Sequence, residues 1–378
     1  MTKPNAVVAI TKHGTAIARR LQERFPDVDV YYPQKFAQGD EDARGIMAFS
    51  GSVVDRVPAL FSNYSGLIGI FSLGAMVRLI SPYLRDKKTD PAVVVIDDRA
   101  EHVISVLSGH LGGANSLTRR VAEALGARPV ITTASDVGQT IAVDLLGRAF
   151  GWEIENFENV TPVSAAVVNE EQVHIIQEAG ETDWWPYPKQ LPAYLSVFQT
   201  MAEARQRPFD AALVITPRLL TKEETKMFLT RGVLYRPKVA VVGIGCNRGT
   251  SADEIESVIG DAMKTAGLSI RSVRNVATID RKGDEPGLVE VCEKHHWPLV
   301  TYTAQELNTV AVPNPSETVF KYVGAYGVCE PAARLSSGAD GWVVEKVRSG
   351  NVTVSISLVP SNLGANLVSA SGAGRALE

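Results

Sequence analysis

The chain has 378 residues, a formal net charge of −4 and a pI of about 6.0, and 45% of its residues are hydrophobic. This length exceeds one ordinary core, so we expect two or three domains. The composition is that of a globular protein rather than a disordered or fibrous one. The acidic balance argues against nucleic acid as a partner, because non-specific nucleic-acid binding needs a basic surplus.

Cysteine usage and hydrophobic run lengths bear on location. The chain has three widely separated cysteines, Cys246, Cys292 and Cys329. This odd number fits a reducing cytoplasm better than a disulfide framework. The N-terminus has a short apolar run followed by charge, so we expect no signal peptide. No run of about 18 apolar residues occurs, so we expect no membrane partner.

The first part of the chain, residues 1–138, alternates strand-like and helical patterns. Strands are predicted at 6–10, 28–32, 66–71 and 128–133, and helices at 13–25, 73–84 and 114–126. Residues 92–107 are typical of two apolar strands on either side of a polar turn at Asp97–Glu101. Alternation of strands and helices predicts an α/β domain with a mostly parallel sheet.

The rest of the chain divides again. Residues 139–236 have a less regular rhythm, which we interpret as a smaller α/β middle domain. A second regular α/β domain with a mostly parallel sheet is predicted at 237–360, with a helix at 251–267 and a hairpin at 341–359. Ser251 and Glu254 have the spacing of a capping box. Residues 361–378 are rich in small residues, which predicts a flexible tail.

The stretch "LSGHLGGAN" lies between a predicted strand and a predicted helix. The first N–H groups of a helix lack internal partners and, with the helix dipole, form a site for anions, including oxyanions. His110 can act as a general base near neutral pH, and Asn115 offers a donor and an acceptor. The stretch also holds three glycines that allow close approach of a ligand or positive φ, namely Gly109, Gly112 and Gly113. The alternative is a glycine-rich turn whose histidine caps the helix or packs against the sheet.

Charged residues nearby are also open to two interpretations. Arg78, Arg85, Lys87 and Lys88 can receive an acidic substrate, or they can form a solvated helix end where cations are favourable. Asp136 follows a predicted strand. Its carboxylate can orient His110 or take a proton, or it can cap the following helix.

Three other sequence features are weaker indications of a functional site. "GIGCNRG" differs from the dinucleotide fingerprint, because its last glycine falls one residue late and no acidic residue follows at the needed place. Cys292, His295 and His296 are predicted on one amphipathic helix, where adjacent side chains point about 100° apart and do not face one metal ion. Trp184 and Trp185 can form a lid or pack against a neighbouring domain.

The run from Val77 to Asp136, which contains "DPAVVVID" and "LSGHLGGAN", resembles the N-terminal region of cobalt-precorrin-5A hydrolases of anaerobic cobalamin synthesis. "VVGIGCNRGTSADEI", followed by "DEPGL" and "NPSE", is similar to their C-terminal domain. That domain also exists alone as a small protein of the aerobic pathway. The resemblance covers nearly the whole chain in the expected order and is weakest from about 140 to 236.

The resemblance implies that the protein opens the δ-lactone of cobalt-precorrin-5A with water and releases acetaldehyde to give cobalt-precorrin-5B. Attack on the lactone carbonyl needs a base and an oxyanion site, and a second proton transfer assists carbon–carbon cleavage. The tetrapyrrole substrate carries many carboxylates, for which helix N-termini and arginines are suitable anchors. Cobalt belongs to this substrate, so no protein metal site and no cofactor are implied. Other enzymes of the corrin pathway are candidate partners, and the oligomeric state stays open.

Within this resemblance we predict His110 as the general base and Asp136 as an aid to proton transfer. The oxyanion donors would be Asn115 and the amides of Gly112 and Gly113. Substrate binding is predicted for Arg78, Lys87, Lys88, Ser108 and Gly109, and for a second anion-binding edge formed by Gly245, Asn247, Arg248, Thr250 and Ser251. The main alternative is a corrinoid-binding or channelling protein without chemistry of its own, and a nucleotide-dependent α/β enzyme fits least.

Overall fold

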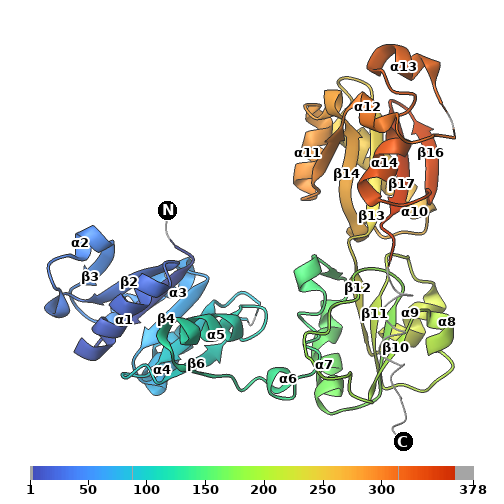
Figure 1. Cartoon of the computed structure of the whole chain (residues 1–378). Helices are drawn as coiled ribbons and strands as arrows, with labels where there is room; N and C mark the ends of the chain where they lie inside the picture. Colours follow the sequence, from blue (N-terminus) through green and yellow to red (C-terminus); the bar gives the residue numbers. More distant parts are fainter. Residues whose placement is uncertain (1–2, 87, 314, 362–378) are drawn as a thin grey trace, which may run out of the picture. The chain divides into compact units, whose positions relative to one another are not determined.

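Three separate β-sheets follow one another along the chain in the computed structural model (Figure 1), which describes residues 3–361 except 87 and 314. One compact unit ends at Leu145 and holds the first sheet, and a second begins at Leu146 and holds the other two. Lys87 and nearly all of the predicted flexible tail lie outside the described residues. No described helix has the length and apolar character needed to cross a membrane.

The first sheet has seven strands in the order β3-β2-β1-β4-β5-β6-β7. Their bounds are β1 (Asn5–Ala9), β2 (Val28–Pro33), β3 (Ile46–Phe49), β4 (Gly66–Ile70), β5 (Ala92–Ile96), β6 (His102–Leu107) and β7 (Arg128–Val130). β1 to β5 run parallel, whereas β6 is antiparallel to β5 and β7 is parallel to β6. The predicted polar turn at Asp97–Glu101 is confirmed, because it joins antiparallel β5 and β6. β6 and β7 therefore end at the edge of the sheet where the other strands begin.

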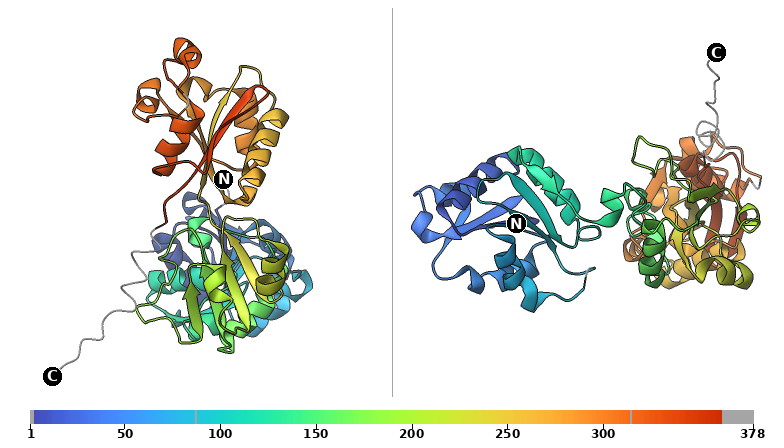
Figure 2. Two further views of the ribbon diagram at one scale, coloured as in Figure 1. Left: turned by 90° about the vertical axis from the view of Figure 1, so that its right-hand side faces the viewer. Right: turned by 90° about the horizontal axis from the view of Figure 1, so that it is seen from below.

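Helices cover both faces of this sheet (Figure 2). On one face α1 (Lys12–Arg24) and α5 (Ala114–Leu125) bury Leu21 and Leu117 against alternate residues of β1, including Val7. On the other face α3 (Val57–Asn63) and α4 (Leu73–Ile80) pack against the intervening strand residues. This alternation is what a strand with both faces buried requires. The predicted helices at 13–25 and 114–126 are confirmed, and the one predicted at 73–84 ends its α-helical part at Ile80.

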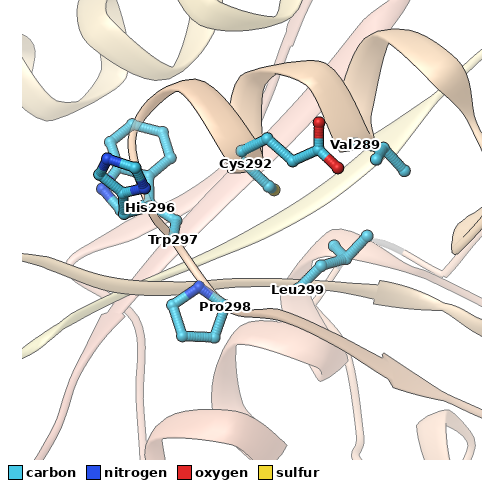
Figure 3. Close-up of a pocket in the computed structure, with 7 residues that line it drawn as sticks. Val289, Cys292, His296, Trp297, Pro298 and Leu299 are labelled. Carbon is cyan, nitrogen blue, oxygen red and sulfur yellow. The ribbon is translucent and has the colours of Figure 1, made fainter. Parts of the chain in front are cut away.

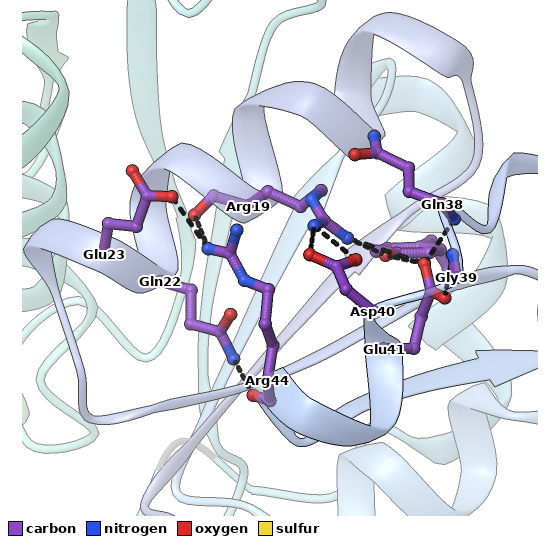
Figure 4. A network of polar contacts seen from close by, with 9 residues as sticks. Arg19, Gln22, Glu23, Gln38, Gly39, Asp40, Glu41 and Arg44 are labelled. Atoms are coloured by element: carbon purple, nitrogen blue, oxygen red, sulfur yellow. Dashed lines mark hydrogen bonds and ion pairs between the residues drawn. The ribbon is translucent and has the colours of Figure 1, made fainter.

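A buried arginine anchors the outer edge of this sheet (Figure 4). Arg19 of α1 donates to the Tyr32 hydroxyl at 2.7 Å and to the Asp40 carboxylate at 2.6 Å. Glu41 begins α2 (Glu41–Arg44) and accepts from the backbone N–H of Gln38. This backbone hydrogen bond leads the interactions that lower the pKa of Glu41 to about 2. A buried charge is tolerated here because it is paired and hydrogen-bonded.

The second sheet has five strands in the order β10-β9-β11-β12-β8, and only its edge strand β8 is antiparallel. Its strands are β8 (Glu153–Ile154), β9 (Val173–Gln177), β10 (Leu195–Phe198), β11 (Ala211–Ile215) and β12 (Gly232–Arg236). The helices beside it are α7 (Val160–Val168), α8 (Met201–Ala204) and α9 (Lys222–Leu229). A buried histidine, His174, lies in its core at ring distances of 4.5 Å from Phe198 and 4.8 Å from Phe209.

The third sheet has the order β15-β14-β13-β17-β16. Its strands are β13 (Ala240–Cys246), β14 (Val273–Ile279), β15 (Leu299–Tyr302), β16 (Val344–Ser349) and β17 (Val352–Leu358). Its helices are α10 (Ala252–Thr265), α11 (Pro286–Lys294), α12 (Ala304–Leu307), α13 (Glu317–Val323) and α14 (Cys329–Ser337). The predicted hairpin is confirmed, as is the predicted fold class of two mostly parallel α/β domains around a smaller middle one.

Two local predictions in this last region need correction. Ser251 accepts from the Glu254 N–H at 3.3 Å, but the Glu254 carboxylate accepts from the Asn351 N–H at 2.8 Å instead of completing a capping box. α11 ends at Lys294, so His295 and His296 do not lie on the helix. His296 has a φ of 55°, which turns the chain away at this point.

Candidate functional site

Two loops of the first unit meet beside the reversed pair of strands. The loop 108–113 follows β6, and α6 (Ala134–Val137) follows β7. Because β6 and β7 are parallel neighbours, both loops lie at the same edge of the sheet. The segment that precedes β5 reaches this edge too, and the Asp90 carbonyl lies 3.3 Å from where a Cβ on Gly112 would stand. Ligands of open α/β sheets commonly bind at the carboxyl ends of parallel strands.

His110 is held at both ring nitrogens. Its Nδ1 lies 3.0 Å from Asp144 Oδ1, and its Nε2 lies 3.1 Å from Asp136 Oδ2 and 3.0 Å from Ser135 Oγ. Hydrogen bonding and charge pairing, with Asp144 first and Asp136 second, raise the pKa of His110 against the opposing effect of burial. The side chain is 18% exposed, so the imidazole is not closed off from solvent.

Asp136 is the centre of this cluster. Its Oδ2 accepts from Asn115 Nδ2 at 2.9 Å as well as from His110, and its Oδ1 pairs with Arg119 of α5. Burial by itself raises the pKa of Asp136. The Arg119 guanidinium and then His110 lower it by more than burial raises it, so the net pKa is below the usual value. The carboxylate is thus held in its charged form.

Asn115 is almost fully buried, at 4% exposure, in the first turn of α5. Its Oδ1 accepts from Ser105 Oγ at 2.7 Å, and its Nδ2 donates to Thr133 Oγ1 and to Asp136, each at 2.9 Å. A carboxamide has two N–H donors, and both are used here. In this arrangement Asn115 orients Asp136 instead of pointing a donor at a ligand.

The glycines of the loop serve close packing within the protein. A Cβ on Gly112 would stand 2.3 Å from Ser108 Cβ, and one on Gly109 would stand 2.9 Å from Asn115 Oδ1. Gly113 has a φ of 86°, as the loop interpretation expected, but its N–H donates to the His110 carbonyl at 2.9 Å. Ser108 has a positive φ of 57°, and its buried Oγ has no hydrogen-bond partner in the described part of the chain. Strain of this kind is typical of functional loops.

The structure brings together His110, Asn115 and Asp136, which were predicted, and adds Asp144, Ser135 and Arg119, which were not. Arg119 lies one helical turn after Asn115 on α5, so its spacing was a usable signal. Asp144 follows an irregular stretch beyond the boundary that we predicted at 138, and no pattern marked it. The first compact unit extends to Leu145 and includes it.

Of the predicted basic residues, the structure describes Arg78, Arg85 and Lys88. Arg78 is exposed in the last turn of α4, which runs back from the carboxyl end of β4 toward the edge that holds the His110 loop. Lys88 is exposed, and its N–H donates to Asp86 Oδ1 at 2.8 Å. The Arg85 N–H donates to the Asp90 carboxylate at 3.1 Å. The segment that carries these cations therefore enters the same edge through Asp90.

The second predicted anion-binding edge has a different character. Arg248 donates to Asp284 Oδ1 at 2.8 Å, and Asn247 Nδ2 donates to Asn351 Oδ1 at 2.9 Å. A Cβ on Gly245 would stand 2.8 Å from Thr353 Oγ1, so this glycine packs against the neighbouring strand. A hollow of about 360 Å³ lies beside Thr250 and Ser251, and it is also lined by three carboxylates, those of Asp253, Glu285 and Glu290. Three carboxylates disfavour an anionic ligand.

A second hollow, of about 630 Å³, lies at the end of α11 and is lined by Cys292, His296 and Trp297 among others (Figure 3). Burial raises the pKa of the Cys292 thiol to about 11. His295 stacks on Trp297 with ring centroids 4.2 Å apart and contacts Glu256 Oε1 at 2.7 Å. No group of three His, Cys, Asp or Glu within the described ranges is arranged to hold a metal ion.

Comparison with known proteins matches all three parts of the chain. Residues 55–136, 141–237 and 240–357 match family profiles described as Cobalamin synthesis G N-terminal, Cobalamin biosynthesis central region and Cobalamin synthesis G C-terminus. The "Cobalt-precorrin-5A hydrolase" of Priestia megaterium is 58% identical over 94% of this chain and 95% of its own length. The protein of the same name from Salmonella typhimurium is 31% identical over 93% of this chain and 96% of its own length.

A solved structure of a cobalamin biosynthesis protein G homolog from Sulfolobus solfataricus is 18% identical and covers 95% of this chain and 98% of its own, with a TM-score of 0.36. "Protein CobE" of a Sinorhizobium species is 34% identical over 31% of this chain and 77% of its own length.

Proposed function

Because this chain belongs to the family of cobalt-precorrin-5A hydrolases of cobalamin biosynthesis, we propose that it opens the δ-lactone of cobalt-precorrin-5A with water. Acetaldehyde leaves, and cobalt-precorrin-5B remains. The protein is thus a hydrolase that acts on a corrinoid substrate. The observation that carries the proposed site is His110, a partly exposed imidazole held between Asp144 and Asp136 at the end of two parallel strands.

His110 is the proton carrier of the proposed mechanism. In its neutral form the ring accepts a proton on Nε2 from the water that attacks the lactone carbonyl. The tetrahedral intermediate then collapses, the ring C–O bond breaks, and the imidazolium returns the proton to the departing oxygen. One water has been consumed, and the products are a carboxylic acid, which ionises by releasing its proton to solvent, and a free hydroxyl on the two-carbon branch.

Asp136 serves the second step. Loss of the hydroxyl proton drives cleavage of the adjacent carbon–carbon bond, which releases acetaldehyde and leaves the electron pair on the macrocycle. Asp136 is charged and contacts His110, so the pair can accept this proton and deliver it to the macrocycle, which holds the electron pair of the broken bond. Asn115 donates to the carboxylate oxygen that contacts His110, and Arg119 pairs with the other oxygen, so together they hold the carboxylate in place.

The hydrogen bonds of the loop limit which groups are available as oxyanion donors. Gly113 and Asn115 already use their donors within the protein. The Gly112 N–H makes no hydrogen bond to any residue that the structure describes, so it is the backbone donor that we propose for the oxyanion. Arg78, Lys87 and Lys88 would hold substrate carboxylates as charged donors.

The cobalt ion enters as part of the substrate, and we propose no cofactor bound by the protein. The three cysteines are free thiols. Free thiols favour a reducing compartment, so we propose a cytoplasmic location.

The test is incubation of the purified protein with cobalt-precorrin-5A, with trapping of acetaldehyde and mass measurement of the corrinoid product. We expect one acetaldehyde for each product molecule, and we expect the His110→Ala variant to lose this release while keeping its fold. A protein that binds the intermediate tightly and releases no acetaldehyde would instead be the corrinoid-binding or channelling protein. Release at the wild-type rate by His110→Ala would remove His110 from its proposed role.

A further inference from the structure

Asp144 approaches His110 from a segment with no regular secondary structure. It lies between α6 and the end of the first compact unit. Its Oδ1 stands 3.0 Å from His110 Nδ1, and its side chain is 17% exposed, which matches the partial burial of the ring that it contacts. The contact is therefore shielded from solvent more than an ordinary surface pair, so its geometry affects the ring more strongly.

The chemistry of the contact decides which ring nitrogen is reactive. Both ring nitrogens face a carboxylate, which only accepts hydrogen bonds, but Nε2 also has the Ser135 hydroxyl, which can donate to it. When the ring loses one proton, Nε2 can therefore accept from Ser135, whereas Nδ1 keeps its hydrogen for Asp144. In the neutral imidazole the lone pair then lies on Nε2. Nε2 is the nitrogen that lies 3.0 Å from Ser135 Oγ and 3.1 Å from Asp136 Oδ2. A contact at one side of the ring thus selects the atom on the other side.

Asp144 and Asp136 have different tasks in this arrangement. Asp136 is already held by Asn115 and Arg119, and it meets the nitrogen that must give and take protons. Asp144 meets the opposite nitrogen, where no proton has to move. Neutral His110 accepts the Ser135 hydroxyl hydrogen on Nε2, and the imidazolium donates from Nε2 to Asp136. The bond from Nδ1 to Asp144 is the same in both states, so it keeps the ring orientation constant while the partner of Nε2 changes.

We propose that Asp144 is a positioning residue of the hydrolytic site, which binds the Nδ1–H of His110 and directs Nε2 toward Ser135 and Asp136. This inference rests on the proposed function for its effect on turnover, but not for its effect on the ring. The charged groups that face the imidazole are Asp144 from the loop and Asp136 from α6, with Arg119 of α5 behind Asp136.

The first experiment needs no substrate. Imidazole ¹⁵N NMR of the full chain, assigned with His110→Gln, reports the tautomer and the titration of His110. In the wild-type protein we expect the neutral form of the ring to be the Nδ1–H tautomer. We also expect the titration midpoint of His110 to lie above that of an ordinary histidine. In Asp144→Asn the midpoint should fall and the tautomers should mix. Asp144→Glu should restore the wild-type tautomer, because it keeps the accepting carboxylate.

The second experiment measures turnover with cobalt-precorrin-5A. For Asp144→Asn we expect kcat to fall by about 10²- to 10⁴-fold, as when a general base is held in the wrong tautomer. KM should change little, and Asp144→Glu should regain part of kcat. Circular dichroism and thermal unfolding check that the variants fold. If Asp144→Asn does not fold, the NMR spectrum of the wild-type protein still tests the tautomer of His110.

The outcomes separate the two proposals. An unchanged His110 titration and tautomer in Asp144→Asn, or a wild-type ring protonated on Nε2 when neutral, would overturn the positioning role. A wild-type protein with the expected ring spectrum but no acetaldehyde release would overturn the proposed function and leave the positioning of His110 standing.

Discussion

The Asn115 carboxamide donates a hydrogen bond across 2.9 Å to the Asp136 carboxylate, on the same oxygen that contacts His110. A buried amide thus fixes the carboxylate that meets the proton-carrying ring. Asn115 therefore acts on catalysis only through Asp136. Its hydrogen bonds contribute separately to the stability of the fold.

Replacing Asn115 with alanine should cost both stability and activity. The change leaves the Ser105 hydroxyl without its acceptor and removes one hydrogen bond to Asp136. We expect a loss of about 1–3 kcal/mol in the free energy of unfolding, as for other buried groups left without partners. Urea unfolding measures this loss, and kcat should fall because Asp136 is less well placed. The exposed neighbour Ser116 is the control, and an equal loss in Ser116→Ala would contradict the interpretation.

The pH dependence of activity and of stability should run in opposite directions through His110. As a base the ring must be neutral, so kcat/KM should rise with pH through a midpoint above 6.5, because the pKa of His110 is raised. The stability from a raised histidine pKa is fully present below the unfolded value of about 6.5 and is lost as pH rises through the folded pKa.

The difference between wild type and His110→Gln in unfolding free energy, measured by urea at several pH values, isolates this effect. The subtraction is needed because burial lowers the pKa of His174, whose contribution is lost in the other direction, as pH falls. A difference that grows with pH would show that the sign is wrong.

Arg119 and Arg120 offer a matched pair on α5. Their side chains are 53% and 54% exposed, but Arg119 pairs with Asp136, whereas Arg120 lies 3.5 Å from Asp27. Arg119→Ala removes a cation close to Asp136 and His110, so it should raise the pKa of both groups and move the His110 midpoint of the kcat/KM profile to higher pH. Each change should alter the unfolding free energy by about 0–1 kcal/mol, as for exposed ion pairs. Arg120→Ala should leave the profile unchanged, and an equal shift in both variants would exclude a specific role.

Gly112 and Gly113 of the loop and Gly126 at the end of α5 should respond unequally to replacement by alanine. A Cβ on Gly112 meets Ser108 Cβ at 2.3 Å, so Gly112→Ala should displace the loop, cost about 1–3 kcal/mol and lower kcat. Gly113 and Gly126 have φ of 86° and 70° with open space around the added Cβ, so each should cost about 1–2 kcal/mol from backbone strain. Thermal unfolding ranks the three variants. Full activity in Gly112→Ala would mean that the loop tolerates the displacement.

Reversing the charge of Arg78 should weaken substrate binding without slowing the chemistry. Exposed cations that hold remote carboxylates bind substrate and transition state alike, so KM for cobalt-precorrin-5A should rise about tenfold while kcat stays the same. Arg248→Glu is the comparison, since Arg248 is paired with Asp284 near a hollow lined by carboxylates. A larger rise in KM for Arg248→Glu would favour the second predicted edge after all.

Sequence patterns located most of the first domain and part of the site. The strand-like runs before and after Asp97–Glu101, the helix from Ala114 and the glycine-rich loop were all predictable, because each depends on residues close together in the chain. The correction at His295 and His296 has the same origin. The apolar pattern of α11 continues past Lys294 to Trp297, whereas the helix ends at Lys294 and His296 takes a positive φ.

The amino-acid sequence by itself determined the α/β class, the succession of strands and helices and the presence of an imidazole between a strand and a helix, because periodicity and turn chemistry are local. Tertiary structure alone decided that β7 pairs parallel to β6 at the edge of the sheet, and that Asp136 and Asp144 meet opposite sides of one ring. It also decided that Asn115 supports a carboxylate instead of facing a ligand. These outcomes depend on which distant backbone segments pair, and no local pattern specifies that pairing.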